Sequence, residues 1–222
     1  MKRISIIFPV LLFFICAAMQ SFSKRKIVFF GDSITQMGVN KGGYIDLLKD
    51  YVADKGWAEQ YELLGAGIGG NKVYDLYLRL EEDVLAKDPT DVLIYVGIND
   101  VWHKTSGIGT DIVKYEQFYE ALIRKMQAKN IRLFLCTPSV IGEKKTGGNP
   151  QDADLDAYSE VIRKLAAKYN CTLIDLRKTF VTYEERYNSS DSTSGVLTTD
   201  QVHLNSKGNQ LVADTMKAYL FK

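Results

Sequence analysis

A serine suited to act as a nucleophile follows directly on an apolar segment near the start of the chain. Ser33 is the third residue of Gly31-Asp32-Ser33, and the preceding residues, 27–30, have the composition of a buried strand. In an α/β protein, a hydroxyl on a sharp turn at the carboxyl end of a strand is well placed to attack a carbonyl carbon. Thr35 stands where the G-x-S-x-G nucleophile elbow requires glycine. The partners of Ser33 must therefore be sought elsewhere in the chain.

A histidine with a nearby carboxylate stands close to the end of the sequence. A serine hydroxyl needs a base to become an effective nucleophile, and the chain has only two histidines, His103 and His203. Asp200 precedes His203 by three residues, so one turn of chain can bring its carboxylate to Nδ1–H and leave Nε2 free to accept the serine proton. The spacing predicts a triad of Ser33, His203 and Asp200.

Hydrogen-bond donors for an oxyanion are available after two further apolar segments. The glycine-rich run 65–70 ends in Gly70, and Gly97-Ile98-Asn99-Asp100 places an amide side chain after the run 91–96. Backbone N–H groups and a side-chain amide are the donors that stabilise the tetrahedral intermediate of acyl transfer. We expect the glycine run, with its free backbone N–H groups, and the Asn99 amide to converge with Ser33 at one cleft.

The elements that must position these residues alternate between short apolar runs and longer amphipathic ones. The run 91–96 is almost continuously apolar, which is typical of a central strand covered on both faces. Helices are predicted where apolar residues recur at helical spacing. The predicted strands are 27–30, 61–64, 91–96, 131–136 and 171–176, and the predicted helices are 44–55, 72–86, 112–129, 155–169 and 206–220. Residues 142–154 are predicted to form a surface loop, and 182–199 show no clear period.

Five alternating strand and helix units predict an α/β fold: a three-layer α/β/α sandwich with a five-stranded parallel sheet. The flavodoxin-like strand order 2-1-3-4-5 places ligands at the carboxyl ends of the strands. Each motif alone has an ordinary structural interpretation: a turn for Gly31-Asp32-Ser33, backbone freedom for Gly70, a helix cap for Asn99, an exposed loop for His203. Their occurrence after the appropriate strands favours a single catalytic cleft.

In these motifs the chain resembles the SGNH hydrolases, also called GDSL-type esterases and lipases, over residues 24–222. The family's nucleophile block matches Gly31-Asp32-Ser33, and its oxyanion-hole blocks match Gly70 and Gly97-Ile98-Asn99-Asp100. Its final Asp-x-x-His block matches Asp200 and His203. Two positions depart from the pattern: Ile34 replaces the usual leucine, and Gly65 replaces the asparagine that opens the second block.

The resemblance implies ester hydrolysis through an acyl-enzyme, with no metal or organic cofactor. Ser33, Asp200 and His203 would be catalytic, and Ser33, Gly70 and Asn99 would form the oxyanion hole. Trp102 and His103 follow the third block and are candidate substrate contacts.

Polar or glycine-rich loops at 104–111, 142–154 and 182–199 favour a short acyl group, and together with the family's range they suggest deacetylation of carbohydrate. A lipase, lysophospholipase or thioesterase is the alternative on the same fold. A carbohydrate-binding module without catalysis, or a nucleotide- or phosphate-binding protein using residues 65–70, would be alternatives of another class. The glycine run lacks a P-loop lysine and fits dinucleotide spacing poorly.

The amino terminus predicts export. Residues 1–23 begin with the basic pair Lys2 and Arg3, continue with an apolar run from Ile4 to Ala18, and end in small residues. This is the layout of a secretory signal peptide, and an uncleaved membrane anchor is the alternative. We therefore expect a secreted or periplasmic protein with no stable membrane association after cleavage.

The formal net charge of +1 gives no reason to expect a nucleic-acid partner. Cys136 and Cys171 are expected as buried thiols rather than as a disulfide.

Overall fold

Five parallel strands form the centre of the computed structural model, which describes residues 24–221. The strands run in the order β2-β1-β3-β4-β5, as predicted. Their bounds are β1 Arg25–Gly31, β2 Tyr61–Gly67, β3 Asp91–Tyr95, β4 Arg132–Cys136 and β5 Thr172–Ile174. The predicted signal peptide, residues 1–23, lies outside the described residues.

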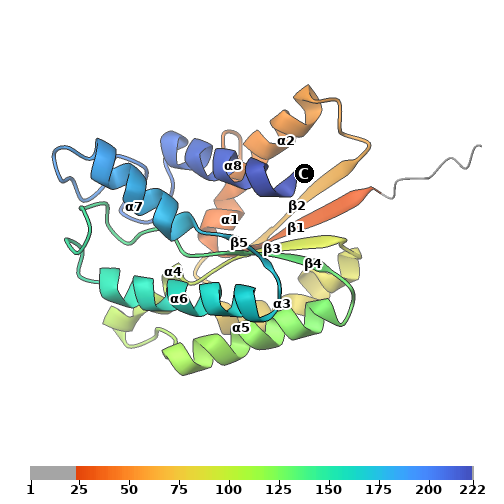
Figure 1. Ribbon diagram of the computed structural model, residues 1–222, viewed down its shortest axis with the longest axis horizontal. Coiled ribbons are helices and arrows are strands. Elements are labelled where there is room, and N and C mark those ends of the chain that lie inside the picture. The colour runs from red at the N-terminus through yellow and green to blue at the C-terminus, as the bar shows by residue number, and fades with distance from the viewer. Residues whose placement is uncertain (1–23, 222) are drawn as a thin grey trace, which may run out of the picture.

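Helices cover both faces of the sheet. Figure 1 shows α2 and α8 on one face, with α7 beside α8, and α3, α5 and α6 on the other face. The predicted three-layer α/β/α sandwich is therefore confirmed. The helix bounds are α1 Ser33–Gly38, α2 Tyr44–Asp54, α3 Val73–Asp83, α4 Ile98–Trp102, α5 Ile112–Gln127, α6 Asp152–Lys168, α7 Leu176–Tyr187 and α8 Ser206–Leu220, with short 3-10 turns at η1 Leu85–Lys87 and η2 His103–Ser106.

The core lies between the sheet and these two helical layers. Every residue of β3 is buried, and so are the last five residues of β1. Burying each large apolar side chain of these strands contributes about 1.5–3 kcal/mol relative to leaving it exposed. The helix α5 shows why the amphipathic segments are helical, because its buried residues recur at helical spacing. Asp111 caps its first turn by accepting hydrogen bonds from the backbone N–H groups of Val113 and Lys114.

Close approach of the strand ends requires a glycine at Gly67. A Cβ at this position would lie 2.1 Å from the Gln36 nitrogen and 2.7 Å from the Asp32 carbonyl oxygen. The absence of a side chain lets the end of β2 pack directly on the first turn of α1. The glycine loop after β2 therefore lies against the turn that carries Ser33.

The structure corrects the prediction for residues 171–199. The strand β5 is shorter than predicted, and α7 occupies Leu176–Tyr187, where part of an irregular segment was expected. Asp175 begins this helix by accepting from the Lys178 N–H. The buried positions include Arg177 and Glu184, so charged residues on the inner face obscured the helical period.

Three smaller differences concern the region before and after α6. The helix α6 starts at Asp152, three residues earlier than predicted. The segment 142–154 is not wholly a surface loop, since Glu143 and Asn149 are buried. Cys136 is buried as expected, but Cys171 is only half-buried because it lies just before the edge strand β5; both are free thiols.

Within residues 24–221, no helix combines the length and the apolar run that a membrane crossing needs. The carboxyl ends of β1, β2 and β3 are adjacent in the sheet. The segments that follow them carry Ser33 at the start of α1, Gly70 in a loop and Asn99 in α4, so the fold places these three residues at one edge of the sheet.

Candidate active site

Ser33 is the first residue of α1 and follows β1 by two positions. Asp32 caps this helix, and its Oδ1 accepts a hydrogen bond of 3.0 Å from the Ile34 N–H. The first N–H groups of a helix have no acceptor within the helix, so the Ser33 N–H is available to a ligand. Burial raises the pKa of Asp32 to about 7, although the bond from Ile34 opposes the shift.

His203 joins Ser33 to Asp200. Its Nε2 lies 3.0 Å from Ser33 Oγ, and its Nδ1 lies 2.7 Å from Asp200 Oδ2. With Nδ1–H donated to the carboxylate, Nε2 is left as the acceptor for the serine hydroxyl. The structure thus brings together the three residues that the motifs predict as a triad.

Asp200 is tied to the backbone of its own turn. Its Oδ1 accepts from the N–H of His203 at 2.8 Å and from that of Val202 at 3.2 Å. Partial burial alone would raise the pKa of Asp200, but the bonds from His203 and Val202 outweigh it and lower the pKa. The carboxylate is therefore ionised at neutral pH and can orient the imidazole.

The loop that carries this pair is held by a buried carboxylate. Glu143 is fully buried and accepts from the backbone N–H groups of Val196, Leu197 and Thr198 at 2.8, 2.5 and 2.6 Å. A bridge between Thr198 and Leu204 closes the loop around Asp200 and His203. Sequence reasoning missed Glu143, because nothing in residues 142–154 distinguishes its carboxylate from those of solvent-exposed residues.

The two predicted oxyanion donors outside the Ser33 turn, Gly70 and Asn99, lie in the segments that follow β2 and β3. Gly70 adopts φ +76°, a conformation that favours glycine, and its N–H has no hydrogen-bonding partner among residues 24–221. A Cβ placed on the preceding Gly69 would lie 4.0 Å from Ser33 Cβ, so this loop adjoins the nucleophile. Asn99 is buried in α4 and donates from Nδ2 to the Asn71 carbonyl at 3.0 Å.

Trp102 and His103 occupy different positions relative to the triad. The Trp102 ring makes an edge contact with His203, with centroids 6.5 Å apart, and it lines a cavity of about 460 Å³ together with Gln201, Thr193 and Gln151. His103 packs against Trp102 and does not line this cavity; its buried Nδ1 has no partner among the described residues. Burial, with the charge of Lys72, lowers the pKa of His103.

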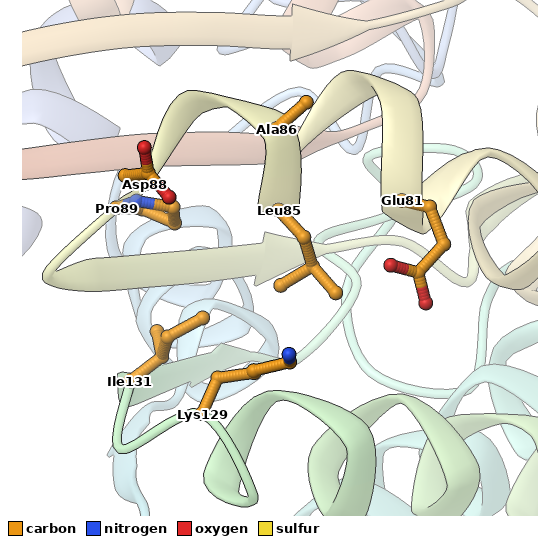
Figure 2. A pocket seen from close by; sticks show the side chains of 7 residues that line it. All are labelled: Glu81, Leu85, Ala86, Asp88, Pro89, Lys129 and Ile131. Carbon is orange, nitrogen blue, oxygen red and sulfur yellow. The ribbon is translucent and has the colours of Figure 1, made fainter.

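A second cavity, of about 550 Å³, lies at the opposite edge of the sheet. Figure 2 shows Leu85 from η1 facing Lys129 and Ile131, which precede β4. These segments lead into the amino ends of β3 and β4, whereas the triad lies at the carboxyl ends. This cavity is therefore separate from the candidate active site.

Among residues 24–221, no three His, Cys, Asp or Glu side chains are grouped as ligands for a metal ion.

Comparison with known proteins shows the family of this chain. The model of the GDSL-like Lipase/Acylhydrolase family matches residues 29–211. The chain belongs to this family. As a GDSL-like acylhydrolase, it is a carboxylic ester hydrolase.

Relatives of this GDSL-like hydrolase include proteins described as acetylxylan esterases. It is 34% identical over 179 residues to an acetylxylan esterase of Geobacillus stearothermophilus, covering 71% of this chain and 78% of the relative. The crystal structure of the acetyl xylan esterase AlAXEase is 56% identical, with a TM-score of 0.87, and the match covers 88% of this chain and 99% of that one. LAE5, an α/β hydrolase from the metagenome of Lake Arreo in Spain, is 27% identical with a TM-score of 0.77, covering 89% and 96%.

Proposed function

We propose that this chain is a secreted serine esterase that removes acetyl groups from carbohydrate through an acyl-enzyme. The single observation that carries the proposal is the hydrogen-bonded line from Asp200 through His203 to Ser33. That line ends beside the glycine loop, where the Gly70 N–H has no partner within residues 24–221 and where the Asn71 carbonyl holds the buried Asn99 amide. These are the parts that acyl transfer requires.

In the first half of the reaction, Ser33 Oγ attacks the ester carbonyl while His203 Nε2 takes the hydroxyl proton. The carbonyl oxygen becomes an oxyanion, which the N–H groups of Ser33 and Gly70 and the Asn99 amide stabilise. Each such donor is typically worth about 3–4 kcal/mol in the transition state. The imidazolium, held by the ionised Asp200, then returns the proton to the departing sugar oxygen as the C–O bond breaks.

In the second half, water takes the place of the sugar. His203 removes a proton from the water, and the resulting hydroxide attacks the acyl carbon of the acetyl-serine ester. The second tetrahedral intermediate collapses, His203 protonates Ser33 Oγ, and acetate leaves. The enzyme is regenerated without any redox step.

The cavity beside His203 supports a carbohydrate as the alcohol portion of the ester. An indole ring flanked by hydroxyl and amide groups, here Trp102 with Thr193, Gln151 and Gln201, suits a sugar ring, which has an apolar face and a polar rim. The acetylxylan esterases among the relatives point in the same direction. Secretion rests on the composition of residues 1–23.

An acyl-chain series tests the proposal. Purified enzyme would be assayed on 4-nitrophenyl acetate, butyrate, octanoate and dodecanoate, and on acetylated xylo-oligosaccharides, with Ser33→Ala as the inactive reference. We expect the highest kcat/KM on acetyl substrates and release of acetate from the oligosaccharides. A preference for the octanoyl or dodecanoyl ester would favour a lipase instead.

A further inference from the structure

One arginine on α3 uses all its hydrogen-bond donors at the carboxyl edge of the sheet. Arg79 Nη2 donates to the carbonyl oxygens of Gly31 at 2.7 Å and Ala66 at 3.0 Å. Its Nη1 donates to the same Ala66 carbonyl at 3.0 Å and to Asp83 Oδ2 at 2.7 Å. Its Nε donates to Asn71 Oδ1 at 2.7 Å. A guanidinium has five N–H donors, and these five bonds occupy them.

The acceptors belong to the segments that build the candidate active site. Gly31 ends β1 and precedes Ser33 by two residues, while Ala66 lies at the end of β2 before the glycine loop. Asn71 directly follows Gly70. A single planar group therefore fixes the spacing between the nucleophile turn and the loop that bears the proposed oxyanion glycine.

The same arginine reaches the third proposed donor through one intermediate. The side chain of Asn71 accepts from Arg79, and the backbone carbonyl of Asn71 accepts from Asn99 Nδ2 at 3.0 Å. A primary amide has two N–H donors, so the bond to Asn71 holds the amide plane and leaves the second N–H for a ligand. A shift of Asn71 would rotate the Asn99 amide.

The environment of Arg79 holds its guanidinium in place. The side chain is 13% exposed, and its guanidinium carbon lies 4.6 Å from the centroid of the Phe30 ring. Asp83, the one carboxylate bonded to it among the described residues, lies on the solvent side with 36% of its side chain exposed. The three remaining acceptors are the carbonyl oxygens of Gly31 and Ala66 and the side-chain oxygen of Asn71. The spacing of the segments that carry them therefore depends on the shape of the guanidinium more than on its charge.

We propose that Arg79 is a positioning residue for the oxyanion hole, setting the Gly70 loop and the Asn99 amide relative to Ser33. This inference rests on the proposed serine mechanism. Displacement of catalytic groups by about 1 Å can reduce the rate by about a hundredfold. Lysine at this position keeps the charge but cannot make the planar set of bonds.

The test compares Arg79→Lys with Asp83→Asn, which weakens the one ion pair of Arg79 that does not involve the strand ends or the Gly70 loop. The readouts are kcat and KM on 4-nitrophenyl acetate, thermal unfolding, and the affinity for a phenylboronic acid, which forms a tetrahedral adduct with an active serine. We expect Arg79→Lys to lower kcat by about tenfold to a hundredfold, to change KM less than threefold and to weaken boronate binding in parallel. Asp83→Asn should stay within threefold of wild type on every kinetic measure.

Two outcomes would overturn the proposal: kcat of Arg79→Lys within threefold of wild type, or a lower kcat in folded protein with unchanged boronate affinity. If Arg79→Lys does not fold, Asn71→Ala replaces it, since this variant removes one acceptor and keeps the other four bonds of Arg79. The expected result is then a kcat at least threefold lower with weaker boronate binding, and wild-type kinetics would contradict the proposal. Loss of activity in Ser33→Ala with an active wild type separates these outcomes from failure of the serine mechanism itself.

Discussion

The carboxylate of Glu143 lies 2.6 Å from the backbone nitrogen of Thr198, two residues before Asp200. This contact and the bonds from Val196 and Leu197 attach the Asp200–His203 loop to the segment that follows β4. The position of His203 over Ser33 therefore depends on a residue that takes no part in the proposed chemistry.

Glu143→Gln should lower both stability and turnover. Glutamine can accept through only one oxygen, and its NH₂ group opposes the N–H donors of the loop. Loss of a charged acceptor for buried N–H groups costs about 1.5–3 kcal/mol, so we expect a lower melting temperature and a lower kcat at temperatures where the variant is folded. Glu185→Gln is the matched control, because that exposed carboxylate accepts from Thr146 and makes no contact with the Asp200–His203 loop among the described residues. Equal effects of the two substitutions would contradict the assigned role.

Asp200→Asn should reduce kcat by roughly 10⁴-fold with a much smaller change in KM. The amide can donate to Nδ1, which favours the tautomer with its proton on Nε2, and that nitrogen then cannot accept from Ser33. Steady-state kinetics on 4-nitrophenyl acetate measure this, with circular dichroism to show that the variant is folded. A kcat within tenfold of wild type would mean that this carboxylate is dispensable.

Glu184 gives the folded protein a stability that depends on pH. Burial raises its pKa to about 8, with repulsion from Glu143 adding to the shift, and its Oε1 has no partner among the described residues. Because the folded state holds this proton longer than the unfolded state does, the contribution of Glu184 is fully present below the unfolded pKa near 4.5 and falls as pH rises to about 8.

Glu184→Gln removes that titration. The variant should lose less stability than wild type between pH 5 and pH 8.5 in urea unfolding, and at pH 8.5 it should be the more stable of the two by roughly 1–3 kcal/mol. Parallel stability curves for the two proteins would show that Glu184 titrates normally.

Trp102→Ala should affect acetylated xylo-oligosaccharides more than 4-nitrophenyl acetate. Loss of the ring removes one wall of the cavity beside His203. Because stacking on an aromatic ring contributes on the order of 1 kcal/mol, we expect kcat/KM on the oligosaccharide to fall by about fivefold or more beyond any change on the small ester. His103→Ala is the control from the same turn, because His103 does not line the cavity. A loss of the same size on both substrates in Trp102→Ala would argue against a sugar-binding role.

The parallel sheet and the grouping of the motifs could be predicted because they rest on local patterns. Continuous apolar runs such as 91–96 identify strands, and the order of the elements then determines which loops share an edge. The helix α7 could not be predicted in the same way, since Arg177 and Glu184 are buried on its inner face and interrupt the apolar period. Their burial depends on distant partners, as in the ion pair between Arg177 and Asp152.

The residues that support the site were the hardest to predict. Glu143 and Arg79 carry ordinary charged side chains at positions with no motif, and their roles follow from contacts with segments far away in the chain. Motifs identify residues whose chemical type is required. The residues that position them become apparent only once the backbone acceptors and donors are located in space.

Trapping the acyl-enzyme tests the central claim most directly. Wild-type enzyme and Ser33→Ala would be mixed with 4-nitrophenyl acetate, quenched in acid within milliseconds, digested and analysed by mass spectrometry. A transient acetyl group on the peptide that contains Ser33, formed at a rate compatible with kcat and absent from Ser33→Ala, is the predicted result. Acetylation of another residue at that rate, or undiminished hydrolysis by Ser33→Ala, would contradict it.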